Sequence, residues 1–507
     1  MPGYPRPRAI SATRLAALAD LLAAELVPAD ATVEISGVTH TSDAVRSGDL
    51  YCALPGSRRH GAEFVPAAAA SGAVAVLTDR AGAPAAAATG LPALIVDEPR
   101  AQMGRAAAAI YGDATSRLSV LGITGTNGKT STAYLVEAGL AAAGRTTGLI
   151  GTVETRLAGD RLDSTRTTPE ATDLQALFAV AEERGVDTVV MEVSSHALDL
   201  HRVTGTHFAV GAFTNFGVDH LDFHGSVEAY FAAKAKLFDG RCAAEVLNVD
   251  DAAVVKLVRP GRTITVSVEG QPSADWRAGR ISRAGYGQEF EVMGPDGLRL
   301  TGGVALPGRH NVANALLAVA ILAAAGVDPA VAVAGVAECG GVPGRMERVI
   351  APGQVAGVVD FAHTPGAVTA ALASLREAAA LEDGRVICVV GSGGDRDRSK
   401  RPMIGEAAAR GADELIVTDD NPRFEDPAQV RAEVAAGAAP VPGARWREVA
   451  GRAEAIATAV AHSRPGDIIA VLGRGHEQNQ EVAGKVLAFD DRIVLRDALT
   501  DRFGEGV

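Results

Sequence analysis

Aromatic residues, basic charge and long apolar runs are all scarce in this 507-residue sequence. Phe, Trp and Tyr together make up 4% of it, so a core must be built mainly from Ala, Val and Leu. Acidic residues outnumber basic ones by 61 to 48, which gives a net charge of −13. No Lys/Arg cluster is large enough to offset that balance, so we expect no nucleic-acid partner. The most apolar stretch, residues 312–327, contains Asn314 and is too short to span a bilayer. It predicts a buried helix and no membrane insertion.

Cysteine is also rare, and the four residues lie far apart without a CxxC pair: Cys52, Cys242, Cys339 and Cys388. This spacing fits neither a thiolate zinc site nor a disulfide framework, and it favours a reducing compartment. The first ten residues contain Arg6 and Arg8 but no apolar segment typical of a signal peptide. The 47% hydrophobic and 21% charged content is ordinary for globular proteins and excludes a disordered or collagenous chain. We therefore expect a folded, cytoplasmic protein.

The chain length predicts about three domains, and the sequence pattern changes twice. Residues 1–115 read as a small α/β unit with a helix over residues 15–26 and a few short strands. Residues 116–342 alternate strand and helix, which predicts a mainly parallel sheet, with antiparallel hairpins over residues 261–306. Residues 343–507 contain four apolar strand candidates that each end in Gly, Asp, His or Asn. Because ligands bind at the carboxyl ends of strands in open α/β sheets, this last unit predicts a substrate-binding edge.

The strongest local signal is GITGTNGKTST, residues 122–132, between a strand and a helix. Glycines let backbone N–H groups turn toward an anion, and the helix adds its positive end. Lys129 is placed to reach the β- and γ-phosphates of a nucleotide, and the hydroxyl of Thr130 to approach Mg²⁺. The GxxxxGK[ST] pattern is imperfect, because Ile123 stands at its first glycine. A plain turn before a helix is the alternative, and the loop alone does not distinguish a ligase from a GTPase, motor or kinase.

Three further groups carry weaker signals. Glu192 ends an apolar strand and is either a Mg²⁺ ligand or part of a Ser-rich helix cap. The loop with His220 and His224 lacks zinc-type spacing, and its histidines are more often structural. Lys234 and Lys236 lie on an expected helix, where the residues alone predict solvated lysines.

Taken together and in order, these segments resemble the Mur ligase family, the ATP-dependent amide ligases that build the peptidoglycan stem peptide. The resemblance covers almost the whole chain and rests on TGTNGKTST, TTPEATDLQ, MEVSSHAL, TNFGVDHLDFHG, AYFAAKAKLF, LPGRHNVANALLA, GVPGRMERV, VVDFAHTPGAV, GSGGDRDRSKRP, TDDNPR and GRGHEQNQ. It implies an α/β protein of three domains. These are a UDP-sugar-binding domain (1–115), an ATP-binding domain with the phosphate loop and a mostly parallel sheet (116–342), and a Rossmann-like amino-acid-binding domain (343–507).

The resemblance also implies roles for individual residues. Those expected to bind ATP are Gly125, Thr126, Asn127, Gly128, Lys129, Thr130, Ser131, Asn311, Asn314, Arg345 and Asp360. The catalytic residues would be Lys129, Glu192, His220 and Lys234, and the Mg²⁺ ligands Thr130, Glu192, His220 and Lys234. Lys234 matches the lysine that the family carbamylates with CO₂ to N6-carboxylysine, which turns a cation into an anion able to bind Mg²⁺.

Two substrate sites follow from the same resemblance. The residues matching the UDP-N-acetylmuramoyl-dipeptide site are Ser42, Ser57, Arg58, Arg59, Thr167, Thr168, Ser194 and Arg202. Those matching the amino-acid site are Arg396, Asp420, Asn421, Pro422, Arg423, Gly473 and Glu477. In the family the DNPR motif goes with diaminopimelate rather than lysine, and a guanidinium can bind the extra carboxylate of diaminopimelate bidentately. The alternative for this motif is a solvent-exposed turn.

The activity implied is ADP-forming addition of diaminopimelate to UDP-N-acetylmuramoyl-L-alanyl-D-glutamate through an acyl phosphate, with hinge motion near residues 340–344. The alternatives are a relative with another acceptor, such as L-lysine or a folylpolyglutamate, and a nucleotide-binding regulatory protein without ligase activity. We expect small-molecule partners and a monomer. The sequence departs from the family pattern at several positions, among them Val218, His310, Gly366 and Arg474.

Overall fold

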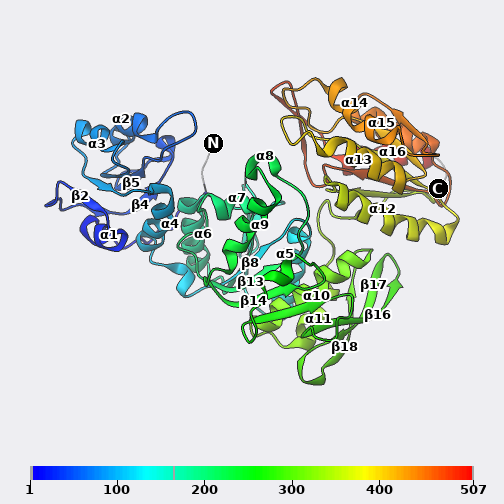
Figure 1. Ribbon diagram of the computed structural model, residues 1–507, viewed down its shortest axis with the longest axis horizontal. Helices are drawn as coiled ribbons and strands as arrows, with labels where there is room; N and C mark the ends of the chain where they lie inside the picture. Colours follow the sequence, from blue (N-terminus) through cyan, green and yellow to red (C-terminus); the bar gives the residue numbers. More distant parts are fainter. Residues whose placement is uncertain (1–3, 164–165, 505–507) are drawn as a thin grey trace.

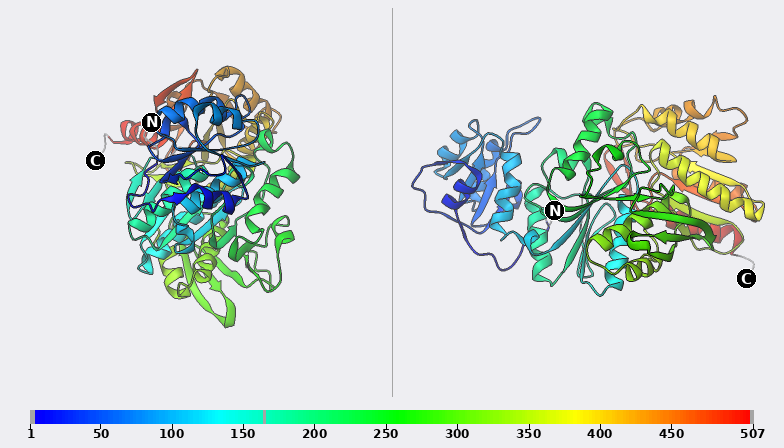
Figure 2. Two further views of the ribbon diagram at one scale, coloured as in Figure 1. Left: turned by 90° about the vertical axis from the view of Figure 1, so that its left-hand side faces the viewer. Right: turned by 60° about the horizontal axis from the view of Figure 1, so that its bottom comes forward.

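The computed structural model describes residues 4–163 and 166–504 and contains three α/β units that follow one another along the longest axis (Figures 1 and 2). Each unit is built around its own sheet of five, eleven or six strands. The expected α/β fold of three units is therefore confirmed.

The first unit has strand order β2-β7-β6-β5-β4, parallel except for β2. Its strands are β2 (Glu25–Val27), β4 (Gly37–Thr39), β5 (Asp49–Cys52), β6 (Ala75–Thr78) and β7 (Ala93–Ile95), and its helices α1 (Leu15–Leu22), α2 (Val65–Ala70), α3 (Ala83–Thr89) and α4 (Pro99–Ile110). The prediction of a helix over residues 15–26 is wrong at its end, because the observed helix is four residues shorter. It ends at Leu22 because Ala23 takes a left-handed conformation (φ +51°), and Leu26 pairs with Leu94 in the sheet instead. A short pair, β1 (Thr13–Arg14) and β3 (Glu34–Ile35), lies beside this sheet.

The central sheet runs β11-β10-β9-β12-β8-β13-β14-β15-β16-β17-β18. Its strands are β8 (Ser119–Thr124), β9 (Thr147–Ile150), β10 (Thr155–Leu157), β11 (Asp160–Leu162), β12 (Thr188–Glu192), β13 (Phe208–Phe213), β14 (Cys242–Asn248), β15 (Thr263–Ser267), β16 (Trp276–Ala284), β17 (Gly287–Met293) and β18 (Arg299–Val304). From β9 to β16 the strands are parallel, and both edges are antiparallel. The expected hairpins over residues 261–306 are confirmed for β16–β18 and wrong for β15, which extends the parallel part.

Helices cover both faces of this sheet, and alternate residues of each strand serve the two faces. In β8, Leu121 and Ile123 pack with α5 (Lys129–Ala142), α10 (Arg309–Ala324) and α11 (Pro329–Ala337), whereas Val120 packs with α4 and α6 (Ala171–Glu183). The predicted buried helix over residues 312–327 is confirmed as most of α10. Three short helices, α7 (Ser195–Asp199), α8 (Leu221–His224) and α9 (Val227–Ala235), follow strands β12 and β13.

The third unit has strand order β19-β20-β24-β21-β22-β23, parallel except for β19. Its strands are β19 (Glu347–Val349), β20 (Ala356–Asp360), β21 (Val386–Val390), β22 (Glu414–Val417), β23 (Trp446–Glu448) and β24 (Ile468–Leu472). Its helices are α12 (Pro365–Ala379), α13 (Lys400–Gly411), α14 (Pro427–Ala438), α15 (Arg452–His462) and α16 (Asp491–Phe503), and a hairpin pairs β25 (Asn479–Val482) with β26 (Lys485–Ala488). The four strands expected from the sequence are β20, β21, β22 and β24, so that prediction is confirmed.

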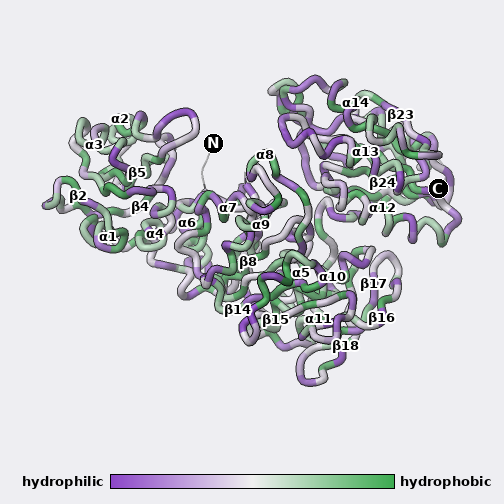
Figure 3. The backbone as a smooth tube through the Cα atoms, viewed as in Figure 1, coloured by the Kyte–Doolittle hydropathy of each residue, from purple (hydrophilic) through white to green (hydrophobic). Residues whose placement is uncertain are grey.

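Apolar segments are spread over the strands and helices of all three units (Figure 3). Within residues 4–163 and 166–504, no helix combines the length and the apolar character needed to cross a bilayer.

Candidate active site

The phosphate loop joins β8 to α5, and two of its glycines are sterically required. Gly125 has φ +143°, and a Cβ there would lie 1.9 Å from Thr214 Oγ1. Gly128 has φ +84°, and a Cβ there would lie 2.4 Å from Asn314 Oδ1. Neither distance is possible for a real side chain, so the loop packs this closely on its neighbours only with glycine. Asn314, from α10, thereby lies directly against the loop.

Two residues that the sequence analysis left without a role support this loop. Thr214 Oγ1 donates to the carbonyl of Asn127 at 2.6 Å, and Asn215 Oδ1 accepts from the Asn127 N–H at 3.0 Å. The N–H of Thr126 donates to the Asn215 carbonyl at 2.9 Å. Their position in the sequence could have indicated this role, because both residues follow strand β13, which neighbours β8 in the sheet.

Two lysines share one acceptor beneath the loop. Lys129 Nζ donates to the Gly125 carbonyl at 2.8 Å, and Lys234 Nζ donates to the same oxygen at 2.7 Å. Lys234 is 1% exposed and lies 4.7 Å from the centre of the Tyr230 ring. Burial, with the like charge of Lys129, holds the pKa of Lys234 well below its usual range. The prediction from residues alone, two solvated lysines, is therefore wrong for Lys234 and confirmed for Lys236, an exposed residue that pairs with Asp199.

Glu192, at the end of β12, is held by hydroxyl and amide donors. Thr130 Oγ1 donates to Glu192 Oε1 at 3.0 Å, and the N–H and hydroxyl of Thr152 donate to its two oxygens at 2.7 and 3.1 Å. Glu192 is not the cap of helix α7. That cap is Ser194, whose Oγ accepts from the Ala197 N–H. The pairing of Thr130 and Glu192 places two hard oxygen ligands at the start of α5, the donor type that Mg²⁺ prefers. The sequence did not indicate that Thr152 contacts Glu192.

His220 lies beside Tyr230 and His196. Burial lowers its pKa to about 3 despite the neighbouring carboxylate of Asp219, so the ring stays neutral near pH 7. In the described parts of the chain, no three His, Cys, Asp or Glu side chains gather closely enough to hold a metal. A Mg²⁺ ion here would therefore depend on phosphate oxygens for several ligands, as is usual for nucleotide-bound Mg²⁺.

The third unit reaches this site through Arg345, Lys400 and His363. Arg345 Nη2 donates to Thr130 Oγ1 at 3.1 Å. Lys400 Nζ and His363 Nε2 lie 3.5 and 3.7 Å from the carboxylate oxygens of Asp219. These contacts bring the third unit onto the phosphate-loop side of the central sheet.

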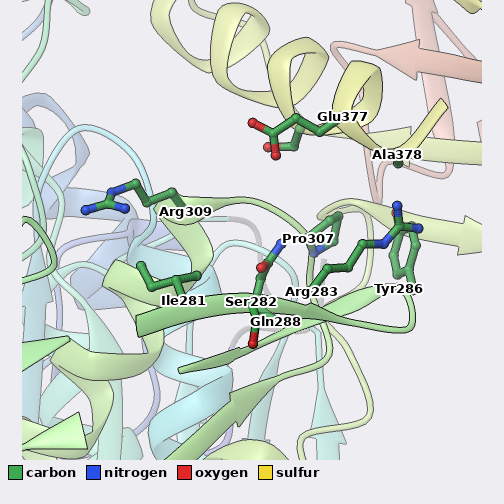
Figure 4. Close-up of a pocket in the computed structure, with 10 residues that line it drawn as sticks. Ile281, Ser282, Arg283, Tyr286, Gln288, Pro307, Arg309, Glu377 and Ala378 are labelled. Carbon is green, nitrogen blue, oxygen red and sulfur yellow. The ribbon is translucent and has the colours of Figure 1, made fainter. Parts of the chain in front are cut away.

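Asn311 and Asp360 lie close to this interface. Asn311 Nδ2 donates to the carbonyl of Pro307 at 2.7 Å, and its Oδ1 accepts from Asn314 at 3.1 Å. Asp360 accepts from the N–H groups of Met346 and Ala362 at 2.6 and 2.8 Å. Near Pro307, a cavity of about 310 Å³ lies between hairpin β16–β17 and α12 of the third unit (Figure 4).

The residues matched to the dipeptide site divide into two groups. Thr168 Oγ1 donates to the Glu192 carbonyl at 2.9 Å and accepts from the Ser194 N–H at 3.1 Å. Arg202 Nη1 donates to the Thr168 carbonyl at 3.4 Å, and Thr167 Oγ1 lies 3.0 Å from the Thr152 hydroxyl. The second group belongs to the first unit: Ser42 begins a short 3-10 helix, and the loop after β5 contains Ser57, Arg58 and Arg59. The structure brings the first group together beside Glu192.

The DNPR residues follow β22 and lie in a cluster of polar and charged side chains. Asn421 Nδ2 donates to Glu477 Oε2 at 2.7 Å, and Asn421 Oδ1 accepts from the Glu481 N–H at 2.9 Å. Asp420 and Asn421 are 8% and 7% exposed, which is not the geometry of a solvent-exposed turn. Burial, with the neighbouring Asp420 carboxylate, raises the pKa of Glu477. Gly473 borders Asp420 so closely that a Cβ would lie 2.7 Å from Asp420 Oδ2.

Arg423 is the cationic member of this cluster and has φ +52°. Its Nη1 donates to the Gly394 carbonyl at 2.6 Å, and its Nε lies 3.6 Å from Glu481 Oε2. Gly393 separates Arg423 from the exposed Arg396, since a Cβ at Gly393 would lie 3.0 Å from Arg423 Nη1 and 3.8 Å from Arg396 Cγ. Glu481 was missed by the sequence analysis, because it belongs to β25 and follows the GRGHE motif.

Comparison with known proteins agrees with this arrangement. Residues 34–111, 123–322 and 344–475 match the Mur ligase family catalytic domain, the Mur ligase middle domain and the Mur ligase glutamate ligase domain. The chain belongs to the Mur ligase family.

Two relatives that carry the name UDP-N-acetylmuramoyl-L-alanyl-D-glutamate–2,6-diaminopimelate ligase are similar over almost their whole length. The protein of Streptomyces avermitilis is 52% identical, with 99% of both chains covered, and that of Streptomyces coelicolor is 53% identical, with 98% covered. A solved structure of the same name aligns with a TM-score of 0.65 at 30% identity, covering 92% of this chain and 95% of the other.

Proposed function

We propose that this protein is an ATP-dependent, ADP-forming amide ligase that adds diaminopimelate to UDP-N-acetylmuramoyl-L-alanyl-D-glutamate in peptidoglycan synthesis. The observation that carries the proposal is that the third unit contributes residues both to the phosphate-loop site and to the expected amino-acid site. Arg345 reaches the phosphate-loop residue Thr130, and the same unit holds the polar cluster of Asn421, Arg423 and Glu477. The two Streptomyces relatives, named for this reaction, support it.

The reaction needs an activated acid. A γ-carboxylate oxygen of the D-glutamate residue attacks the γ-phosphorus of ATP, and the bond to ADP breaks. The amine of diaminopimelate then attacks the acyl carbon, the new C–N bond forms, and phosphate leaves as the amine loses its proton. Lys129, which donates to the Gly125 carbonyl of the phosphate loop, would neutralise charge on the transferred phosphoryl group, a mainly electrostatic form of catalysis. We propose that the units 1–115, 116–342 and 343–507 hold the nucleotide-sugar, ATP and the amino acid respectively.

We propose the remaining ATP contacts from the resemblance to the family. The loop amides of residues 125–131 would face the phosphates, with Asn311 and Asn314 toward the base and Asp360 toward the ribose. Ser42 and residues 57–59 would hold the uridine end of the acceptor. Gly344 accepts from the Phe361 N–H, which fixes one end of the expected hinge to the third unit.

A divalent metal fits the residues present. Thr130 and Glu192 offer hard oxygen ligands, and the neutral ring of His220 offers a nitrogen. Bound Mg²⁺ would supply charge neutralisation at the phosphates. We further propose that Lys234 is carbamylated, since its lowered pKa leaves amine free to combine with CO₂ and the resulting anion would relieve the repulsion with Lys129.

For the amino acid, we propose that Arg423 binds the carboxylate at the far end of diaminopimelate, with Arg396 as a second cation. Asp420, Asn421 and Glu477 would meet its ammonium group, with Pro422 and Gly473 bordering the amino acid. This division of charge distinguishes diaminopimelate from lysine, whose side chain ends without a carboxylate.

The test is release of phosphate with ATP, Mg²⁺ and the UDP-muramoyl dipeptide, using diaminopimelate, lysine or glutamate as the third substrate. We expect release with diaminopimelate only. Release with lysine at equal efficiency would favour another acceptor type. No release with any amino acid, despite ATP binding, would favour a regulatory protein and overturn the proposal.

A further inference from the structure

Two loops of the third unit meet at the expected amino-acid site. The β21 loop, residues 391–399, follows strand β21, and the β22 loop, residues 418–426, follows strand β22 and contains the DNPR residues. Hydrogen bonds join the loops directly. The Gly394 N–H donates to the Asn421 carbonyl at 2.8 Å, and the Gly394 carbonyl accepts from Arg423 Nη1 at 2.6 Å. The position of each loop therefore depends on the other.

Each loop contains a residue in the left-handed region of backbone conformation. Asp395 has φ +50° and Arg423 has φ +52°, and neither is glycine. A side chain disfavours this region, so the surrounding contacts must hold both residues there. Asp395 directly precedes Arg396, the second cation expected to meet the amino acid. A loop that relaxed at either position would move one of the two guanidiniums.

Arg401, the second residue of α13, is 0% exposed and binds both loops. Its Nη2 donates to the Gly393 carbonyl of the β21 loop at 3.2 Å. The same guanidinium forms a bidentate ion pair with Glu425 of the β22 loop, at 2.7 and 3.0 Å. Its Nη1 also donates to Glu433 on α14 at 2.7 Å. One buried side chain therefore fixes the two loops to each other and to the helices that follow them.

Glu425 extends this link to the left-handed residue of the β21 loop. Its Oε1 accepts from the Asp395 N–H at 2.5 Å, and Asp395 Oδ2 accepts from the Phe424 N–H at 3.1 Å. Hydrogen bonds from Arg401 lower the pKa of Glu425, so the carboxylate stays charged near pH 7. Removing Arg401 or Glu425 would therefore release the β21 loop from the β22 loop at this point.

We propose that Arg401 and Glu425 are positioning residues for the selection of diaminopimelate. By holding the β21 and β22 loops together, they keep Arg396 and Arg423 where both guanidiniums reach the carboxylate at the far end of this substrate. Arg401 is itself buried and acts only through the loops. This inference rests on the proposed function, in which Arg423 binds that carboxylate.

The test uses Glu425→Gln and Arg401→Gln in the full-length enzyme. Initial rates of phosphate release, with the other substrates saturating, give KM for diaminopimelate. Misplaced guanidiniums lose part of a charge-assisted pair, so we expect each variant to raise this KM by about 5- to 30-fold. The value of kcat and the KM for ATP should change by less than about twofold. Lysine lacks the far carboxylate, so its inhibition constant against diaminopimelate should also stay within about twofold.

A double variant shows whether the pair acts through Arg423. In the Arg423→Ala background the guanidinium to be positioned is absent, so adding Glu425→Gln should raise KM for diaminopimelate by no more than about threefold. Additive losses would mean that Glu425 acts independently of Arg423 and would overturn the inference. The matched control is Arg410→Gln, which removes an exposed arginine of α13 that pairs with Glu406. It should leave every constant unchanged.

Glu425→Gln keeps the test decisive if Arg401→Gln does not fold, because Arg401 retains its pair with Glu433 in that variant. An unchanged KM for diaminopimelate in Glu425→Gln would overturn the inference. Equal increases in the KM for ATP and in the inhibition constant of lysine would overturn it too, since they indicate a distorted unit. If the wild type releases no phosphate with diaminopimelate, the proposed function fails. If the wild type is active but the substitutions leave its KM unchanged, only the present inference fails.

Discussion

Lys129 and Lys234 donate to one carbonyl oxygen, that of Gly125, at 2.8 and 2.7 Å. Burial lowers the pKa of both ammonium groups, and the like charge of Lys129 lowers the pKa of Lys234 further. The arrangement favours a state in which one nitrogen is uncharged or converted to an anion. This is the physical link between the phosphate loop and the proposed carbamylation of Lys234.

Lys234→Met should stabilise the protein while abolishing ligation. In the wild type, the unfolded chain binds a proton on Lys234 that the folded chain resists between the lowered pKa and the ordinary lysine value. Stability should therefore rise with pH across that window, and the substitution should flatten the rise. Thermal unfolding at pH 7 and pH 9 in CO₂-free buffer measures both slopes. Lys236→Met, at the exposed lysine, is the matched control. Equal slopes in wild type and Lys234→Met would contradict the account.

Glu192→Gln should weaken the binding of Mg²⁺ without unfolding the protein. The amide keeps the size of the side chain and can still accept from Thr130 and Thr152, but it lacks the charge that a divalent ion needs. We expect phosphate release to fall by about 100-fold or more, with a higher Mg²⁺ concentration at half-maximal rate. Glu269→Gln, at an exposed ion pair with Arg309, is the control. A normal Mg²⁺ titration in Glu192→Gln would show that this carboxylate is not a ligand.

The sequence predicted much of this site because its motifs are local. The loop of residues 125–130, Glu192 and the DNPR residues are each read from a short stretch at a strand end. What it could not predict depends on contacts between distant segments. The burial of Lys234 follows from the packing of α9 under the phosphate loop, and Glu481 reaches Arg423 only because β25 lies against the DNPR loop. The short helix α1 was misjudged because apolar spacing continued past the left-handed turn at Ala23.

Arg423→Ala should raise KM for diaminopimelate by about 10- to 100-fold, the range given by losing a charge-assisted pair. KM for ATP and for the UDP-muramoyl dipeptide should stay within about twofold, because the Arg423 side chain contacts Gly394 and Glu481 of the third unit. Initial rates with each substrate varied in turn measure this. Arg398→Ala, an exposed arginine that pairs with Glu433, is the control. Equal increases in all three KM values would indicate a distorted unit rather than a lost carboxylate contact.

His310→Phe should make the protein more resistant to acid. Burial lowers the pKa of His310 to about 4, whereas an unfolded histidine titrates near 6.5. Between these values the unfolded chain binds a proton that the folded chain does not, so stability falls as the pH drops from about 7 toward 4. At pH 5 this loss amounts to about 2 kcal/mol, which phenylalanine would remove. Urea unfolding at pH 5 and pH 7.5 measures the difference. An equal pH dependence in both proteins would contradict the prediction.

The central claim is that the acceptor's carboxylate is activated by direct phosphorylation. It is tested by following ¹⁸O from the labelled γ-carboxylate of the UDP-muramoyl dipeptide during turnover with ATP and diaminopimelate. Attack of that carboxylate on the γ-phosphorus leaves one labelled oxygen in the phosphate released when the amide forms. We predict one ¹⁸O in each phosphate molecule by mass spectrometry. Phosphate without label, released at the same rate as the amide product, would contradict the account.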